Sequence, residues 1–209
     1  MTPSLMHTVT STAALALTLA ACAGAPPRTA PEPAAKNPGR VSPADVHFMS
    51  AMIGHHSQAL LMAGWAPSHG ASSSVRTLAE RIASGQQDEI VTMQQWLRDR
   101  GKPVPEAKAA GMKMMMNGHE MLMPGMLTQQ QLEQLDRARG PEFDRLFLNF
   151  MIQHHRGAVA MVKQLFGTNG AAQDETVFKF ANDVSVDQST EVARMERMLA
   201  ALPSGQRSP

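Results

Sequence analysis

The residues of this chain that could do chemistry are histidines, methionines and glutamates that recur at a fixed spacing. An adjacent histidine pair, His55-His56, follows Met52-Ile53, and the same arrangement returns 99 residues later as Met151-Ile152 with the pair His154-His155. Imidazole nitrogens and thioether sulfurs both bind transition metals. The repeat therefore raises metal binding as one hypothesis. Whether these side chains can meet depends on the secondary-structure elements that carry them.

Alternating steps of four and three residues place these side chains on the faces of amphipathic helices. The first face of each repeat comprises Phe48, Met52, His55, Ala59 and Met62, and then Phe147, Met151, His154, Ala158 and Met161. The second face comprises Ile82, Gln86, Glu89, Met93 and Trp96, and then Val184, Gln188, Glu191, Met195 and Met198. Two helical hairpins that pack these faces together predict an all-α four-helix bundle. No stretch alternates with a period of two over a length that would predict a strand.

Proline and glycine set the expected boundaries of the helices. Pro43 and Pro141 stand where helices should begin, and glycines at 70, 101 and 170 follow the expected helix ends. We expect a bundle domain at 43–202, which comprises repeat one at 43–101, a Met-rich connector at 102–127 and repeat two at 141–202.

Polar residues on the inner faces of a bundle need a partner, because an unpaired buried carboxylate costs several kcal/mol. In an antiparallel hairpin, the central histidine of one helix can lie level with Gln86 and Glu89, or with Gln188 and Glu191, of the other. His56 and His155 fall about 100° further round, where they can reach a neighbouring helix or solvent. Two interpretations stay open. One is a hydrogen-bonded layer that fixes the register of the helices. The other is metal binding by histidine beside the thioethers of Met52, Met62, Met93, Met151, Met161 and Met195.

The connector between the repeats favours metal binding. Residues 111–126 include seven methionines and one histidine, and their glycines and proline argue against a continuous helix. Thioethers select soft ions, so Cu(I) is the expected ion and Ag(I) should compete. The candidate ligands here are Met112, Met114, Met115, Met116, His119, Met121, Met123 and Met126. The alternative is a flexible methionine-rich surface that docks a hydrophobic partner.

The N-terminal segment predicts export. Residues 13–21 are apolar but too few to span a bilayer, and the sequence Leu19-Ala-Ala-Cys22 resembles a bacterial lipobox. We expect a lipoprotein signal peptide at 1–21, lipidation of Cys22 and a Pro/Ala-rich tether at 22–42, which together anchor the chain to the cell envelope. A plain secretory peptide is the alternative.

The cysteine count and the net charge exclude further classes of function. Because Cys22 is the single cysteine, disulfides and thiolate catalysis are excluded, and a net charge of +1 argues against nucleic-acid binding.

Three motifs together resemble the bacterial family called domain of unknown function 305 (DUF305). They are the repeated Met-Ile-x-His-His, the segment Gln86-x-x-Glu89-Ile90-x-x-Met93, and the turn Met123-Pro124-Gly125-Met126. The resemblance implies a ferritin-like four-helix bundle that is often exported. It also implies CopM-like copper binding that extends to silver and supports copper resistance. The ligands it implies are both histidine pairs, Met52, Met151, and the methionines and histidine of the connector.

The leading hypothesis is an extracytoplasmic protein that binds Cu(I), sequesters it or passes it to a partner protein, and is not an enzyme. Binding of Cu(II) by the histidine pairs stays open. One alternative is a ferritin-like metal-dependent oxidase, but no glutamate has a histidine three residues later, as a di-iron site uses, and the helix faces offer only Glu89 and Glu191. The other alternative is a metal-free interaction module of the envelope.

Overall fold

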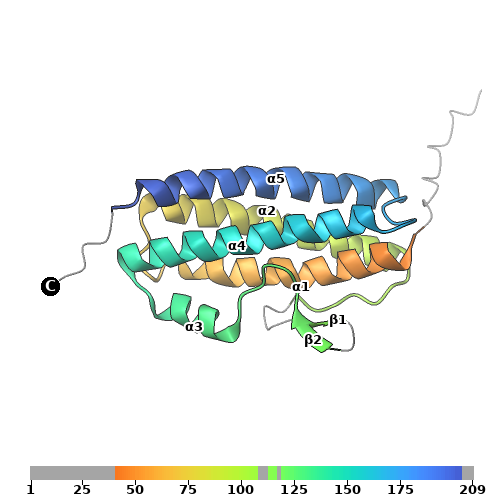
Figure 1. Cartoon of the computed structure of the whole chain (residues 1–209), viewed down its shortest axis with the longest axis horizontal. Coiled ribbons are helices and arrows are strands. Elements are labelled where there is room, and N and C mark those ends of the chain that lie inside the picture. The colour runs from red at the N-terminus through yellow and green to blue at the C-terminus, as the bar shows by residue number, and fades with distance from the viewer. Residues whose placement is uncertain (1–40, 108–112, 117–118, 204–209) are drawn as a thin grey trace, which may run out of the picture. The chain divides into compact units, whose positions relative to one another are not determined.

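Four long helices dominate the computed structural model, which describes residues 41–107, 113–116 and 119–203. They are α1 (Pro43–Trp65), α2 (Ser73–Asp99), α4 (Gly140–Gly167) and α5 (Glu175–Ala201), and they lie alongside one another as a bundle (Figure 1). This arrangement confirms the predicted all-α bundle. The predicted signal peptide, Cys22 and the tether up to residue 40 lie outside the described residues.

The two repeats form two helical hairpins, since α1 packs against α2 and α4 packs against α5, while α1 and α4 bring the hairpins together. Helix α1 begins after the N-cap Ser42, whose hydroxyl accepts the N–H of Asp45 while the Asp45 carboxylate accepts the N–H of Ser42. Pro43 occupies the first turn, where its missing N–H breaks no helical hydrogen bond. Across the part of the chain that the structure describes, no helix combines the length and apolarity that crossing a membrane requires.

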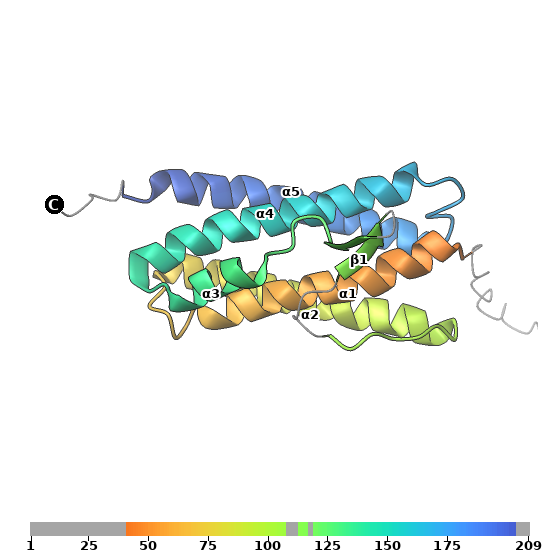
Figure 2. The same cartoon turned by 60° about the horizontal axis from the view of Figure 1, so that its bottom comes forward.

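The chain between the hairpins contains elements that the helical periodicity does not indicate. Strands β1 (Lys113–Met116) and β2 (His119–Leu122) pair antiparallel, and a short helix, α3 (Gln129–Arg137), follows. The N-cap of α3 is Thr128, which exchanges hydrogen bonds with Gln131 in a capping box. From β2 the chain crosses the face made by α1 and α4 before it enters α3 (Figure 2).

Two apolar clusters fill the bundle, and the histidine pairs separate them along both central helices. One cluster takes Phe48 and Met52 from α1 with Ala158 and Met161 from α4. The other takes Ala59 and Met62 from α1 with Phe147 and Met151 from α4. A polar layer therefore crosses the middle of the core, where α1 passes from one cluster to the other.

Two buried aspartates at matching positions of the repeats tie the hairpins to each other. Asp45 near the start of α1 accepts the backbone N–H of Ala172 in the loop between α4 and α5, at 2.6 Å. Asp144 near the start of α4 accepts the N–H of Ser72 in the loop between α1 and α2, at 3.1 Å. Each hairpin thus holds the other by its loop, which helps to keep α1 and α4 in register.

Candidate metal centre

The central pair of the polar layer is His55 of α1 and His154 of α4. Both side chains are fully buried, and their ring centroids lie 3.9 Å apart at an interplanar angle of 40°. The two residues occupy equivalent positions of the repeats, so the contact between α1 and α4 brings the repeated motifs together. The sequence predicts both as inward-facing, and the structure places them accordingly.

Backbone carbonyls fix the protonation of these two rings. His55 Nε2 donates to the carbonyl oxygen of Pro124 at 3.0 Å, and His154 Nε2 donates to the carbonyl oxygen of His55 at 2.9 Å. A carbonyl oxygen only accepts hydrogen bonds, so the proton of each neutral ring must lie on Nε2. The lone pair of each ring is then on Nδ1, which is the nitrogen left to bind a metal.

The outer histidines, His56 and His155, contact the glutamates of the partner helices. His56 Nε2 lies 2.8 Å from Oε2 of Glu89, and His155 Nε2 lies 2.7 Å from Oε2 of Glu191. This corrects one expectation, because the central histidines were expected to meet the glutamates. Both outer rings are fully buried, whereas the glutamates are about a quarter exposed, at 23% and 24%.

All four rings leave Nδ1 buried without a hydrogen-bond partner among the described residues. Buried polar atoms are normally paired, so four such nitrogens in a single layer need an explanation. In metal sites, the second ring nitrogen of a ligating histidine usually donates to a carbonyl or a carboxylate. Here each Nε2 makes that contact, so the donor set fits a metal bound through Nδ1.

The central rings are neutral at physiological pH. Burial, followed by the charge of neighbouring His56, lowers the pKa of His55 to about 3. Burial, followed by the charges of His55, His155 and His56, lowers the pKa of His154 well below its ordinary value of 6.5. A neutral imidazole binds a metal without first releasing a proton, so these two rings are in their ligating form across the neutral range.

The candidate methionines of the helices all lie in the core, close to the polar layer in sequence. Met52 and Met151 stand one helical turn before His55 and His154, on the same helix faces, and both are fully buried. Four others, Met62, Met93, Met161 and Met195, are also buried, and all six methionines belong to the two apolar clusters on either side of the layer. Their burial agrees equally with packing, as expected for methionine at helical spacing.

Part of the connector lies against the central pair. Gly125 and Gly157 approach so closely that a Cβ on Gly157 would meet the carbonyl oxygen of Pro124 at 2.0 Å. Met123 and Met126, which flank this turn, are buried. Met112 lies outside the described residues, and for Met114, Met115, Met116, His119 and Met121 the structure describes only the backbone.

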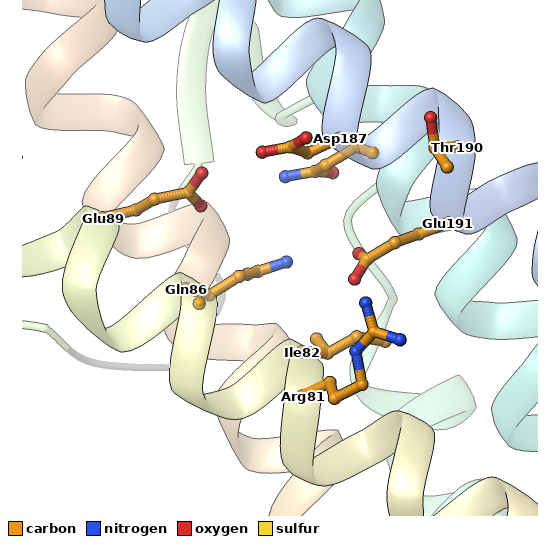
Figure 3. Close-up of a pocket in the computed structure, with 9 residues that line it drawn as sticks. Arg81, Ile82, Gln86, Glu89, Asp187, Thr190 and Glu191 are labelled. Carbon is orange, nitrogen blue, oxygen red and sulfur yellow. The ribbon is translucent and has the colours of Figure 1, made fainter.

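The partly exposed sides of Glu89 and Glu191 open into a pocket of about 270 Å³ between α2 and α5 (Figure 3). Asp187 also lines this pocket, and so do Gln86 and Gln188. Burial, and then the negative charges of Glu89, Asp183 and Glu191, raise the pKa of Asp187. Asp187 lies one position off the predicted helix face, next to Gln188, so the helical periodicity does not single it out.

No group of three or more His, Cys, Asp or Glu side chains stands ready to hold a metal ion in the described ranges. A centre built on the polar layer therefore needs donors of another kind. The thioethers of Met52 and Met151, one helical turn from the central histidines, are of that kind, and they favour soft ions such as Cu(I).

Solved structures similar to this chain include copper-bound ones. A DUF305 fragment from Deinococcus radiodurans is 28% identical with a TM-score of 0.66, and the match covers 78% of this chain and 99% of that one. A DUF305 protein from Streptomyces coelicolor, described as secreted, is 27% identical with a TM-score of 0.64, covering 79% and 98%. CopM in its Cu(II)-bound form is 30% identical with a TM-score of 0.58, covering 75% and 95%. CopM is also known in Cu(I)-bound and silver-bound forms.

The search of curated proteins found no match to the chain. The family model described as domain of unknown function (DUF305) matches residues 45–199, which include all four long-helix motifs and the turn at Pro124. This confirms the resemblance seen in the motifs, and the chain belongs to the DUF305 family.

Proposed function

We propose that this chain is an extracytoplasmic copper-binding protein that holds Cu(I) on histidine and methionine side chains and performs no catalysis. The observation that carries the proposal is the layer of four buried imidazoles whose Nε2 atoms are engaged and whose Nδ1 atoms are not. The contacts at Nε2 orient the rings, and His55 and His154, which donate to carbonyls, are in the correct tautomer before a metal arrives.

The ligand set that we propose begins with the Nδ1 atoms of His55 and His154. Met52 and Met151, one turn away on the same faces, add thioethers, and sulfur with nitrogen suits Cu(I) and Ag(I) better than hard cations. Glu89 and Glu191 would act through the outer histidines, by holding those rings. Cu(II) remains an alternative ion for the histidines. The similarity to CopM, which has been solved with Cu(I), Cu(II) and silver, supports a metal of this class.

The proposed location is the outer side of a membrane, with Cys22 lipidated and the tether at 22–42 linking it to the bundle. A relative described as secreted supports export. In that location methionine has an advantage over cysteine, because thioethers bind Cu(I) without forming disulfides under oxidising conditions. Sequestration and transfer to a partner protein both follow from such a site.

Competition against a chromogenic Cu(I) chelator under anaerobic conditions tests the proposal. We expect the purified full-length chain to withdraw at least one Cu(I) ion, and X-ray absorption at the copper edge should reveal nitrogen and sulfur neighbours together. The double variant His55→Gln, His154→Gln should lose the nitrogen neighbours, whereas His47→Gln, at an exposed position of α1, should retain them. The proposal is wrong if the chain retains no Cu(I), or if the double variant shows an unchanged spectrum.

A further inference from the structure

We infer that the pocket between α2 and α5 is the port through which a Cu(I) ion enters and leaves the buried histidine layer. This port presupposes the proposed copper binding and adds a route to it. The pocket does not itself hold the ion, because the described His, Cys, Asp and Glu side chains include no group of three that could do so. Its lining residues therefore govern the rate of exchange, whereas the layer determines the affinity.

The layer needs a route because protein surrounds it. All four of its imidazole rings are fully buried, so an ion reaches an Nδ1 atom only by passing other side chains. The two apolar clusters close the layer at both ends along the bundle. An ion that crossed such a cluster would lose its hydration without gaining polar contacts, which is strongly unfavourable. The route must therefore run sideways, between two helices.

The connector closes the side of the layer that α1 and α4 form. Gln58 of α1 donates to the backbone carbonyl oxygen of Leu127 at 3.1 Å, and its own side-chain oxygen accepts the N–H of Leu127 at 2.7 Å. The turn at Pro124 and Gly125 lies so close to α4 that a Cβ on Gly157 would meet its backbone atoms. The backbone of the connector thus covers the layer on this side.

The side between α2 and α5 is open. The long helices pack closely in the pairs α1–α2, α4–α5 and α1–α4, and α2–α5 is not among these pairs. The pocket of about 270 Å³ lies there (Figure 3), and it has room for an ion with several waters, since one water occupies about 30 Å³ in the liquid. Glu89 and Glu191 line the pocket and also contact His56 and His155. The pocket therefore reaches the layer at these two contacts.

The polar groups of the pocket suit the passage of a cation. Gln86 and Gln188 are only 3% and 2% exposed, and their amide nitrogens and oxygens lack a hydrogen-bond partner among the described residues. Figure 3 shows the Gln86 side chain extending into the space faced by Glu89 and Asp187. Three carboxylates against the guanidinium of Arg81 leave a formal charge of −2, which attracts cations. Because oxygen donors suit a soft ion poorly, Cu(I) passes them and is retained further inside.

A bulky side chain at Gly85 tests the port, because Gly85 lines the pocket and a Cβ there would meet nothing within 4 Å. Release of Cu(I) from the loaded full-length chain into an excess of chromogenic chelator, without oxygen, measures the exit rate. Equilibrium competition measures the affinity. An obstacle on the route raises the barrier equally for entry and exit, so Gly85→Phe should slow release about tenfold or more and change the affinity less than about twofold.

Three further variants separate obstruction from other effects. Thr190→Phe fills the pocket from α5 and should slow release as Gly85→Phe does. Gly85→Ala leaves the pocket open, and Gly64→Phe adds the same bulk at an exposed position of α1 outside it, so both should release Cu(I) at the parental rate. Thermal melts verify that each variant is folded.

Two results would overturn the port. One is release from folded Gly85→Phe and Thr190→Phe at the rate of Gly64→Phe. The other is a loss of affinity in these variants, which would make the pocket part of the binding site. Failure of the port is distinct from failure of the proposed function, because a parent chain that retains no Cu(I) contradicts copper binding itself, whereas unchanged affinities and release rates remove the port alone.

Discussion

At the scale of single residues, the central question is which atoms of the polar layer remain to bind a ligand. The Nε2 atoms of His55 and His154 donate to backbone carbonyls, so these two neutral rings present Nδ1, and thioethers are the nearest soft donors along their helices. The structure thus identifies Nδ1 as the histidine nitrogen that is available to a metal.

Substitution of Met52 and Met151 by leucine tests whether these thioethers bind the ion. Leucine has nearly the volume of methionine, so the free energy of unfolding should change by less than about 1.5 kcal/mol. Cu(I) affinity should fall, and the sulfur contribution to the X-ray absorption spectrum should decrease. Met62→Leu, two turns beyond His55, is the control that should keep the parental affinity. Equal affinities for all three proteins would assign Met52 and Met151 to packing alone.

The sequence predicted the histidines and glutamates of the layer because polar residues are unusual on an inward helix face. It did not predict which histidine meets which glutamate. Adjacent residues differ by about 100° around a helix, so a modest rotation of α1 decides whether His55 or His56 faces Glu89. The sequence also could not predict that the Pro124 carbonyl accepts a hydrogen bond from His55, because every residue has a backbone carbonyl whatever its type.

At the scale of elements, the turn at Pro124 and Gly125 is the part of the Met-rich connector that contacts α1 and α4. Its backbone lies directly on α4, since a Cβ on Gly157 would be 2.0 Å from the carbonyl oxygen of Pro124 and 2.5 Å from Cα of Gly125. That same carbonyl accepts the hydrogen bond from Nε2 of His55. The contact therefore links the position of the connector to the tautomer of a central histidine.

Gly157→Ala should push this turn away from α4. We expect a loss of about 1–3 kcal/mol in the free energy of unfolding, as overpacking usually causes, together with weaker Cu(I) binding. Gly64→Ala is the matched control, because Gly64 is also helical and nothing lies within 4 Å of a Cβ placed there. That control should gain about 0.5–1 kcal/mol from the better helix propensity of alanine. Urea unfolding measures both, and similar gains in the two variants would contradict the close contact.

Most of the elements could be predicted from the sequence, because Pro43, Pro141 and the glycines that end helices act locally. The strands β1 and β2 could not, since four residues are too few to show a period and methionine has no strong strand preference. Helix α3 had a usable local signal in Thr128 and Gln131, whose spacing matches a capping box.

At the scale of the whole bundle, the repeat produces an arrangement in which equivalent residues face one another. His55 meets His154 where α1 contacts α4, and each of the two outer histidines meets a glutamate of its own hairpin. Between α2 and α5 the space stays open and becomes the acidic pocket. Side-chain volumes across the core determine which pair of helices packs tightly and which pair leaves a pocket. The helical periodicity alone therefore could not predict the pocket.

The buried neutral histidines also make the stability of the metal-free protein depend on pH. In the unfolded chain an imidazole binds a proton near pH 6.5, whereas His55 in the folded chain does so only at about 3, and the pKa of His154 is also lowered well below 6.5. Between these values the unfolded state holds more protons, so acid favours unfolding. We expect the stability to be complete above pH 6.5 and to fall below it, by up to about 1.4 kcal/mol per pH unit for each histidine.

Urea unfolding between pH 7.5 and 5 measures this dependence above the range in which ordinary carboxylates titrate. His47→Gln, at an exposed site of α1, should preserve the slope. His55→Gln should reduce it, because a glutamine at this place takes up no proton in either state. A flat profile in the parent, or the same slope in His55→Gln, would mean that the central rings accept protons inside the folded protein. The layer would then hold charged imidazoles at mildly acidic pH, and a metal bound through Nδ1 would have to displace protons in order to enter.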